Sequence, residues 1–367
     1  MGRIKVGIIG ANPERGWAVR AHVPALRSLD QYELTAVATS RRESAERAAA
    51  EFGAAHSFTD ARQLAGHPDV DLVVVAVRVP QHLELVRAAL DAGKHVYCEW
   101  PLARTTEEAE VLVEGARQAA VHNVIGLQAL RAPAVVRAKE LIDRGELGRI
   151  TSATVHSARG KGAAGQVPAW AAYTLRSANA AGLLEVHGGH VLSVLEHLIG
   201  DIAELSADLS LQHPHQVVAE TGEEVPVDSP DHLVLNARSA SGAVLSATVR
   251  DAEAADPRVL VEIVGTGGSL AIASSGLQDP RGTQIQMSDL ELRRPSEPGR
   301  PWSLVELPPA RAVTEEARNV AATYAQIAEG LRTGEQTAPS FDRALRLHRV
   351  LDAIRASSET GERRRLS

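Results

Sequence analysis

The stretch Ile4-Lys5-Val6-Gly7-Ile8-Ile9-Gly10-Ala11-Asn12-Pro13-Glu14-Arg15-Gly16-Trp17 decides the fold of this chain. It begins with a strand-like run, Ile4–Ile9, and continues into a turn that contains Gly10 and Gly16. A strand-to-helix turn of the pattern Gly-x-Gly-x-x-Gly lets the backbone approach a pyrophosphate, which then sits on the helix N-terminus. Asn12 stands here in place of the second glycine, and one extra residue precedes Gly16. We expect the turn to survive because asparagine tolerates left-handed backbone conformations better than other non-glycine residues.

The surroundings of this turn separate it from an ordinary glycine turn. Strand-like runs and helical patterns alternate over the first third of the chain, and Leu72–Val77 is apolar throughout, as a strand buried on both faces should be. Such alternation predicts a doubly wound, six-stranded parallel sheet with right-handed crossovers. The other expected strands are Ile4–Ile9, Glu33–Ala38, His95–Glu99, Val124–Leu127 and the weaker Ala55–Phe58, and the expected helices are Glu43–Phe52, Gln81–Ala92 and Thr106–Ala120. We therefore predict an α/β Rossmann domain over residues 1–126, with Gly10, Asn12, Arg15, Gly16 and Trp17 at the pyrophosphate.

The pattern changes after Gly148, where strands separated by short turns replace the alternation. These strands are Ile150–Ser157, His232–Arg238, Ala243–Val249, Val259–Gly265 and Ser269–Ala273, and the accompanying helices are Val135–Arg144, Gly182–Leu198, Glu315–Arg332 and Phe341–Ser357. The pattern predicts an α+β domain with a large, mostly antiparallel sheet over residues 127–367, which binds substrate and supports oligomerisation. Ser274–Pro301 is rich in glycine, proline and polar residues and is expected to be a long surface excursion.

Composition excludes several classes of protein. The 367 residues carry a net charge of −7 with acids and bases interspersed, which argues against a nucleic-acid partner. Cys98 is the one cysteine, so an intrachain disulfide or a cysteine-based zinc site is excluded, and a reducing cytoplasm fits. The first residues lack a signal-peptide pattern, and no apolar run approaches the ~20 residues of a membrane span. We expect a cytoplasmic protein without a membrane partner.

The end of the second strand bears on the choice of cofactor. An acidic residue there, ~20 residues past the glycines, would bind the ribose 2′-hydroxyl of NAD. This chain has Thr39-Ser40-Arg41-Arg42 instead. Hydroxyl and guanidinium groups suit a 2′-phosphate, so Ser40, Arg41 and Arg42 favour NADP over NAD. The alternative is that both arginines form a solvated helix start.

Several longer stretches carry a resemblance to a known family. They are Ile8–Ala11, Arg78–His82, Ala92–Ala103, Leu141–Gly148 and Ala353–Gly361. Over nearly its whole length the chain resembles the glucose–fructose oxidoreductase, inositol dehydrogenase and MocA family. Within it the chain is most similar to the branch of the yeast galactose-regulon repressor, through Gly10-x-Asn12, Gly16-Trp17-Ala18, Glu99-Trp100, Leu127-Gln128 with Arg131, Arg137–Ile142 and Gly189-His190. That repressor binds a nicotinamide dinucleotide but regulates transcription through protein contacts, so the resemblance supports the cofactor more firmly than catalysis.

The resemblance also implies a catalytic arrangement. In the family, oxidation of a sugar hydroxyl passes hydride to the nicotinamide while a side chain takes the proton, and a Glu-Lys-Pro lysine and a histidine on the inserted helix supply the polar groups. The matching residues here are Glu99, Pro101 and His190, while Trp100 takes the lysine's place. An indole has one N–H donor and no charge, so it cannot replace an ammonium beside a developing alkoxide. We expect His190 as acid/base and Glu99 as a pocket carboxylate, with a buried structural histidine as the alternative for His190.

Nearby residues extend this candidate site. His187 lies three residues before His190, next to Val186 at the position where the family often has an aspartate. His187 is a further catalytic candidate. A metal on His187, His190 and Glu185 is not expected, because Gly188-Gly189 disfavours a regular helix and the family uses no metal. Lys161 either enters the cleft in place of the missing ammonium or is a solvated lysine on a mobile loop.

Other polar residues are expected along the cleft. Arg78 and His82 follow the fourth strand and Gln128 follows the sixth, at the edge where open α/β sheets bind ligands. We assign these three residues and Glu99 and Trp100 to the cofactor site. Trp100 either stacks near the nicotinamide or sugar, or packs in the core. Tyr173 and Asn179 could hydrogen-bond sugar hydroxyls.

The leading hypothesis is an NAD(P)-dependent oxidoreductase acting on a sugar, a sugar derivative or a polyol. The second is a dinucleotide-bound regulator without turnover, which Trp100 favours and His190 disfavours. A Rossmann domain that binds no dinucleotide is disfavoured by the turn and the resemblance together. The open face of the second domain's sheet needs cover and relatives pair these faces, so we expect a homodimer or homotetramer.

Overall fold

The computed structural model describes residues 2–274, 283–295, 300–309, 311 and 313–366. The chain forms two compact units. Unit 1 comprises Met1–Gln128 and Arg311–His348, and unit 2 comprises Ala129–Ala310 and Arg349–Ser367. The sequence places a domain boundary close to Gln128 but does not anticipate that Arg311–His348 returns to the first unit.

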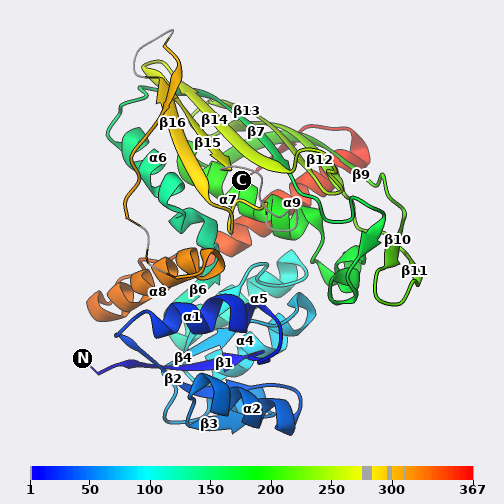
Figure 1. Ribbon diagram of the computed structural model, residues 1–367. Coiled ribbons are helices and arrows are strands. Elements are labelled where there is room, and N and C mark those ends of the chain that lie inside the picture. The colour runs from blue at the N-terminus through cyan, green and yellow to red at the C-terminus, as the bar shows by residue number, and fades with distance from the viewer. Residues whose placement is uncertain (1, 275–282, 296–299, 310, 312, 367) are drawn as a thin grey trace. The chain divides into compact units, whose positions relative to one another are not determined.

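A parallel sheet of six strands forms the centre of unit 1, as the sequence predicts (Figure 1). The strands run in the order β3-β2-β1-β4-β5-β6, and every neighbouring pair is parallel. They are β1 (Ile4–Ile9), β2 (Tyr32–Ala38), β3 (His56–Phe58), β4 (Leu72–Val75), β5 (His95–Glu99) and β6 (Asn123–Gly126). The order reverses direction between β1 and β4, the position at which open α/β sheets bind ligands.

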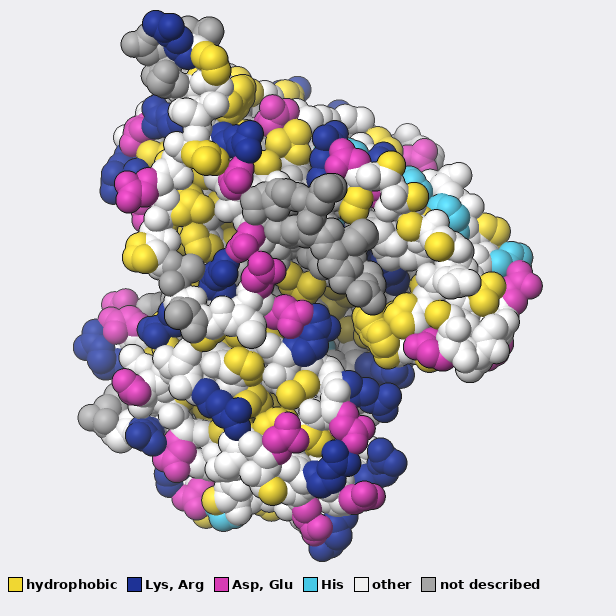
Figure 2. All heavy atoms as spheres, viewed as in Figure 1, with side chains coloured by type: hydrophobic (Ala, Val, Ile, Leu, Met, Phe, Trp, Pro, Cys, Tyr) yellow, Lys and Arg dark blue, Asp and Glu magenta, His cyan; other side chains and the backbone are white. Residues whose placement is uncertain are grey.

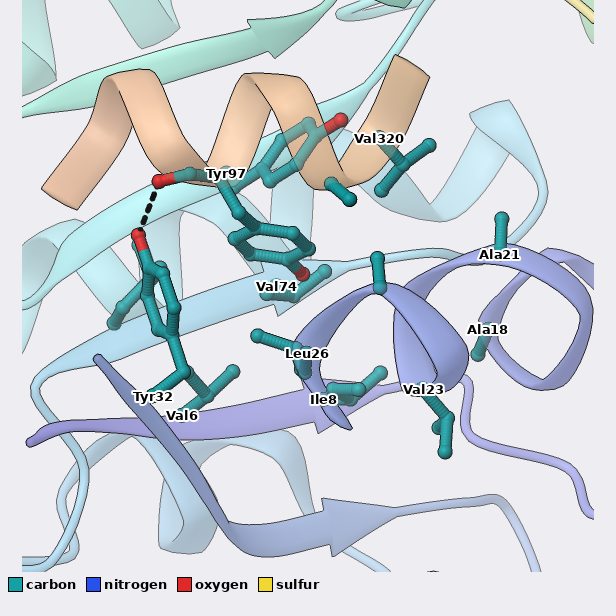
Figure 3. Packing of buried hydrophobic residues seen from close by; sticks show 14 of the residues in the cluster. Val6, Ile8, Ala18, Ala21, Val23, Leu26, Tyr32, Val74, Tyr97 and Val320 are labelled. Atoms are coloured by element: carbon teal, nitrogen blue, oxygen red, sulfur yellow. Dashed lines mark hydrogen bonds between the residues drawn. The ribbon is translucent and has the colours of Figure 1, made fainter. Parts of the chain in front are cut away.

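The two faces of β1 pack against different helices. Because successive side chains of a strand point to opposite faces, Val6 and Ile8 share one face and Gly7 belongs to the other. Val6 and Ile8 lie in a buried cluster with α1 (Val23–Arg27) and α8 (Glu315–Thr333), which Figure 3 shows from close by. On the opposite face a Cβ at Gly7 would come within 2.6 Å of Leu64 in α3 (Ala61–Ala65), so glycine permits the close approach.

The returning helix α8 is part of the Rossmann core. Tyr324 of α8 is fully buried, and its carbonyl oxygen accepts a hydrogen bond of 2.7 Å from the Tyr32 hydroxyl (Figure 3). This apolar and hydrogen-bonded packing explains why Arg311–His348 joins unit 1. The remaining helices of unit 1 are η1 (Ala18–His22), α2 (Arg42–Phe52), η2 (Val79–Gln81), α4 (His82–Asp91), α5 (Thr106–Ala119) and the first part of α9 (Phe341–Thr360).

A nine-stranded sheet forms the centre of unit 2, in the order β17-β16-β15-β14-β7-β13-β12-β9-β18. β7 and β13 pair in parallel and the other neighbours are antiparallel, so the sheet is mixed and mostly antiparallel, as expected. Its strands are β7 (Ile150–Ala158), β9 (Ile202–Ser210), β12 (His232–Ser239), β13 (Val244–Arg250), β14 (Arg258–Gly265), β15 (Gly268–Ser274), β16 (Leu290–Pro295), β17 (Trp302–Leu304) and β18 (Arg364–Arg365). A small second sheet holds β8 (Gln166–Val167), β10 (His215–Val218) and β11 (Glu224–Pro226).

Helices cover one face of the large sheet. Leu233 and Leu235 of β12 are buried on this face, whereas Val234 and Asn236 between them are exposed. α6 (Pro133–Asp143) and α7 (Gly189–Ile199) pack on the buried face, and the last part of α9 is fixed to β9 through Ser357, whose hydroxyl accepts a 3.0 Å hydrogen bond from the Ala207 amide. α7 follows a π-helix, η6 (Leu183–Gly188). The inserted helix is therefore present where expected, but its first turns are not a regular α-helix. The shorter 3₁₀ segments of unit 2 are η3 (Gln128–Arg131), η4 (Ala169–Leu175) and η5 (Ser177–Asn179).

The prediction that Ser274–Pro301 is one long surface loop is wrong in part. Leu290–Pro295 forms β16, because Leu290 and Leu292 alternate with polar residues and bury their side chains in the sheet. Residues 275–282 and 296–299 of that stretch lie outside the described residues. No helix of the described chain is both long and apolar enough to traverse a lipid bilayer.

Candidate functional site

Gly10 ends β1 in a conformation that glycine adopts far more readily than other residues. Its φ is +95°, and a Cβ there would lie 2.5 Å from the carbonyl oxygen of Ala76, just past β4. The Gly10 amide donates a 2.9 Å hydrogen bond to the Ala38 carbonyl at the end of β2. The turn therefore passes between the carboxyl ends of β2 and β4, where no side chain fits at position 10. A residue without a side chain is also what lets a pyrophosphate approach the backbone closely.

Asn12 preserves the turn in a different way from the one expected. Gly10 and Gly16 are the left-handed residues of the turn, with φ of +95° and +103°, and Asn12 is not left-handed. Instead the Asn12 side-chain oxygen accepts a 2.9 Å hydrogen bond from the Glu14 amide, which closes a local side-chain turn. Arg15 and Gly16 are exposed beside it.

Trp17 brings a polar atom to the start of the helix that follows the turn. Its indole nitrogen is buried and has no acceptor among the described residues. The Arg20 guanidinium carbon lies 6.0 Å from the centre of its ring. A buried N–H without a partner is uncommon in proteins and is satisfied most simply by a ligand or an ordered water.

The end of β2 presents the two arginines to solvent. Ser40, Arg41 and Arg42 are all exposed, and Arg41 immediately precedes α2. Arg42 lies 3.8 Å from Glu46, one helical turn away, in an exposed ion pair. Both guanidinium groups are thus on the surface at the edge of the sheet where Gly10 turns.

Glu99 is the last residue of β5 and lies in a buried set of polar side chains with His22 and Tyr324, which the sequence does not reveal. Its Oε1 lies 3.1 Å from Nε2 of His22 on η1, and the Nδ1 of His22 lies 2.8 Å from the Tyr324 hydroxyl. Burial raises the pKa of the Tyr324 phenol well above its usual value, so that hydroxyl remains a donor. The 3.1 Å approach of His22 to Glu99 is a close contact without hydrogen-bond geometry, so His22 Nε2 and Glu99 Oε1 are buried polar atoms without a hydrogen-bond partner among the described residues. Gly126 makes room for the carboxylate, because a Cβ there would lie 2.8 Å from Oε1.

Trp100 and His82 pack inside unit 1. Trp100 is 5% exposed, and its ring centre lies 5.2 Å from that of His348 on α9, so the structure favours a packed tryptophan. The ring nitrogens of His82 lie 2.8 and 3.1 Å from the carbonyl oxygens of Pro101 and Val77. Burial lowers the pKa of His82. His82 therefore holds the backbone around Pro101, and the structure does not support the expected place of His82 in the cofactor site. Arg78 is exposed at the start of η2.

Gln128 follows β6 and is buried. Its side-chain oxygen has no hydrogen-bond donor among the described residues. Like the Trp17 indole, this is a buried polar atom of unit 1 that a ligand can satisfy. The Trp17 nitrogen is a donor and the Gln128 oxygen is an acceptor, the kinds of group that pair with the phosphate oxygens and the carboxamide of a dinucleotide.

The two histidines of the inserted helix are buried in unit 2. Nε2 of His187 lies 3.0 Å from the Ser157 hydroxyl at the end of β7. Nδ1 of both His187 and His190 is buried without a partner among the described residues. Burial, reinforced by the positive charge of Arg159, lowers the pKa of each imidazole to about 3. Both rings are therefore neutral near pH 7, which changes the expectation that His190 titrates near neutrality.

A cluster of buried charges lies close to these histidines. Arg159 binds Asp251 through Nε and, at 3.1 Å, through Nη2, and its Nη1 donates to Gln284. The Lys161 ammonium donates a 2.6 Å hydrogen bond to the Thr174 hydroxyl and lies 3.8 Å from Asp251. Burial lowers the pKa of Lys161 to about 8. Lys161 is thus held inside unit 2, and the alternative of a solvated lysine is wrong.

The remaining candidates of unit 2 are occupied by local contacts. Glu185 does not join the histidines, because its carboxylate pairs with Arg355 at 2.7 Å. The Asn179 amide nitrogen donates to the Tyr173 carbonyl at 2.7 Å, and both side chains are half-buried. These contacts give Glu185 and Asn179 structural roles.

The N-terminal part of the chain matches a described family. Residues 4–126 match the model of the GFO_IDH_MocA family, described as an oxidoreductase family with an NAD-binding Rossmann fold, and residues 133–274 match the C-terminal domain of Gal80p. Levoglucosan dehydrogenase of Pseudarthrobacter phenanthrenivorans is 30% identical over 292 residues, which cover 74% of this chain and 73% of that protein. The chain belongs to the GFO/IDH/MocA oxidoreductase family.

Other members of the GFO/IDH/MocA family resemble the chain in different ways. The galactose/lactose metabolism regulatory protein of Saccharomyces cerevisiae is 26% identical over 288 residues, which span 73% of this chain and 66% of that protein. The structure of a super-repressor mutant of this Gal80p superposes with a TM-score of 0.89 at 23% identity, covering 100% of this chain and 98% of that one. Levoglucosan dehydrogenase in complex with NADH and levoglucosan gives 0.84 at 25% identity, covering 99% of each chain. The fold is therefore shared by a regulator and by enzymes.

The sequence did not point to four of these residues, which are His22 and Tyr324 in unit 1 and Arg159 and Asp251 in unit 2. His22 left a weak signal, as a histidine among apolar helix residues just after the turn, but its partner Tyr324 is remote in sequence. Arg159 and Asp251 each follow a strand, and the parallel pairing of β7 with β13 places Ala158 opposite Arg250. An antiparallel pairing, as the sequence suggested for this sheet, would have separated them.

Proposed function

We propose that this chain is an NAD(P)-dependent oxidoreductase that transfers hydride between the nicotinamide and the hydroxyl-bearing carbon of a sugar, a sugar derivative or a polyol. The single observation that supports turnover is the state of His190, which is buried, neutral and without a partner for Nδ1 among the described residues. A purely structural histidine would be expected to satisfy both ring nitrogens. An unpaired acceptor at a position where the family has its histidine suits a substrate hydroxyl.

In this proposal unit 1 carries the residues for the dinucleotide, and unit 2 carries the candidate acid/base. A bound nicotinamide supplies the hydride acceptor. The turn at Gly10, with Trp17 and Gln128, holds the dinucleotide, and His22 fixes the orientation of Glu99 by contact with Oε1 at 3.1 Å. His190 accepts the hydroxyl proton. A pKa of about 3 makes it a weak base, but the hydroxyl proton becomes much more acidic as hydride leaves, so a weak base is sufficient.

The test of this proposal is the absorbance of reduced nicotinamide with a panel of sugars and polyols and with both oxidised cofactors. We expect turnover with at least one substrate, and a loss of roughly 100-fold in kcat for His190→Ala, as for removal of a general base. His197→Ala on the same helix is the matched control and should keep its activity. Tight cofactor binding without turnover across the panel would contradict the proposal.

For the cofactor we propose a preference for NADP. Ser40, Arg41 and Arg42 are exposed at the end of β2, where a carboxylate would select NAD. Replacing both arginines by Ala should weaken NADP binding by roughly tenfold or more, the size of a lost charge-assisted contact, and leave NAD binding nearly unchanged. Calorimetry measures both affinities. Equal effects on the two cofactors would favour the alternative that Arg41 and Arg42 are solvated residues at the start of a helix.

A second candidate function is a dinucleotide-bound regulator that performs no hydride transfer. The observation that favours it is Trp100, which stands where the family has its lysine and which is buried against His348 rather than presenting a charge. The panel above separates the two candidates. Binding of the dinucleotide without turnover, and a partner protein whose affinity changes with that binding, would support the regulator.

We also propose that the chain forms a homodimer or homotetramer through the open face of the large sheet. Val244 of β13, Ser152 of β7 and Val264 of β14 lie in one row, and Val234 of β12 is on the same face. The three valines are 40–49% exposed. Light scattering should show a dimer or larger that Val244→Asp dissociates, whereas a monomer at micromolar concentration would contradict this proposal. In the part of Figure 2 that belongs to unit 1, basic and acidic side chains are interspersed.

A further inference from the structure

A group of two histidines and an aspartate lies at the other edge of the unit 1 sheet from the Gly10 turn. His56 is the first residue of β3, while His67 and Asp69 lie between α3 and β4. Because the strands are parallel, β3 and β4 both begin on the side of the sheet opposite the carboxyl ends that carry the candidate dinucleotide site, with β2 and β1 between them. This position makes the group independent of the proposed function.

The donor atoms of the three residues are already close together. One ligand atom from each of His56, His67 and Asp69 lies within 4.8 Å of the others. His56 Nε2 and Asp69 Oδ2 are 3.2 Å apart, and the centres of the His56 and His67 rings are 4.1 Å apart. Zinc with bonds of ~2.0–2.1 Å holds tetrahedral ligands about 3.3 Å apart, so one pair has the required separation and the third ligand needs a small movement. All three side chains are half-buried, which leaves their rotamers free to adjust.

The surroundings hold these side chains in place. The Asp69 amide lies 3.2 Å from Nδ1 of His67, and the Asp69 carbonyl accepts a hydrogen bond from the Thr35 hydroxyl. The Phe58 ring centre lies 5.6 Å from that of His67 and 6.4 Å from that of His56. Backbone and aromatic contacts therefore reduce the freedom that a metal would otherwise have to remove.

Lys5 would compete with a metal ion for the Asp69 carboxylate. Its ammonium lies 2.6 Å from Oδ1 of Asp69. The Lys5 amide donates a 2.9 Å hydrogen bond to Oδ2 of Asp71, so a second carboxylate lies near Lys5. A cation that takes Asp69 can thus displace Lys5 toward neighbours that still stabilise its charge.

We propose that His56, His67 and Asp69 bind a divalent transition-metal ion, zinc by the chemistry of the donor set, with water in the fourth position. Two imidazoles and one carboxylate are ordinary zinc ligands. The metal takes the place of the hydrogen between His56 Nε2 and Asp69 Oδ2, and the imidazole keeps its one proton on Nδ1. Bound zinc connects the three-residue edge strand β3 to the segment before β4. This stabilises the least extensive strand of the unit 1 sheet.

The test is a titration of the tag-free protein with zinc chloride by calorimetry. We expect one zinc ion per chain at this site and an affinity at least tenfold lower in each of His56→Ala, His67→Ala and Asp69→Asn. Lys5→Met should bind zinc more tightly than the parent chain, because it removes the competing ammonium. That gain cannot be produced by misfolding.

The matched control is a second histidine pair of the same sheet. The rings of His95 and His122 lie 5.4 Å apart without a third ligand in a metal-binding group among the described residues. His95→Ala and His122→Ala should leave zinc affinity unchanged. Absence of zinc binding, binding that survives all three ligand variants, or binding lost instead in His187→Gln would overturn the proposal. Dinucleotide affinity should be the same with and without zinc, so failure of this site is distinguishable from failure of the proposed function.

Discussion

The turn at Gly10 and the charge cluster around Asp251 are built in opposite ways. The turn is a short segment whose positive φ and backbone hydrogen bonds shape a site with few side chains. The cluster joins Arg159 and Lys161, which follow β7, to Asp251, which follows β13, beside the neutral His187, and it depends on charge in a buried setting. A backbone site is sensitive to the volume of one residue, whereas a site of buried ionisable groups is sensitive to charge balance and pH.

The largest expected effect tests the charge cluster. Asp251→Ala leaves the buried Arg159 without its carboxylate partner and should lower the free energy of unfolding by about 3–5 kcal/mol, the usual cost of breaking a buried pair. Denaturant unfolding measures the change. The exposed pair of Arg42 and Glu46 provides the control, since Glu46→Gln should cost at most about 0.5 kcal/mol. Equal effects of the two substitutions would show that the cluster is not a buried unit.

The next effect tests the backbone turn. Gly10→Ala places a Cβ 2.5 Å from the Ala76 carbonyl oxygen at a φ of +95°, so the turn must move. We expect dinucleotide affinity to fall by roughly 100-fold, which is about 2.7 kcal/mol, measured by calorimetry. Gly53→Ala is the control, because Gly53 also has a positive φ of +79° but has open space around its Cβ position. It should cost stability without changing affinity, and an equal loss of affinity in both variants would contradict a site at Gly10.

A pH effect sharpens the contrast between the two regions. His187 and His190 have pKa values lowered to about 3 in the folded chain, so the unfolded chain binds more protons below its ordinary histidine pKa. Their stabilising contribution is complete above that ordinary value and is lost as the pH falls toward about 3. Between pH 7 and pH 5 each histidine should cost about 2 kcal/mol of unfolding free energy. The same titration of His187→Gln should show a smaller loss, and an unchanged slope would show that His187 is not buried neutral.

The smallest effect concerns the contact behind Glu99. Tyr324→Phe removes the hydroxyl that lies 2.8 Å from His22 and should cost about 1 kcal/mol of unfolding free energy, the typical value of one hydrogen bond. It should also reduce kcat or dinucleotide affinity if His22 positions Glu99. Tyr32→Phe removes a neighbouring hydroxyl bonded to a carbonyl and is the control, with a similar stability cost and no effect on the site. Identical site properties in both variants would mean that His22 does not position Glu99.

The sequence by itself determined the features that depend on local pattern. Alternation of apolar runs and helices predicted the six-stranded parallel sheet, and Gly10 marked the turn at its carboxyl edge. The large, mostly antiparallel sheet was also predicted, apart from β9, β16, β17 and β18. These predictions succeed because strand periodicity and positive φ are properties of a few neighbouring residues.

Tertiary structure decided everything that depends on partners remote in sequence. Helix α8 returns to complete the Rossmann core and brings Tyr324 to His22. The parallel pairing of β7 with β13 brings Arg159 to Asp251, and burial lowers the pKa of His190 to about 3. Desolvation and Coulomb interactions arise from the three-dimensional surroundings of a side chain, so no local pattern contains them.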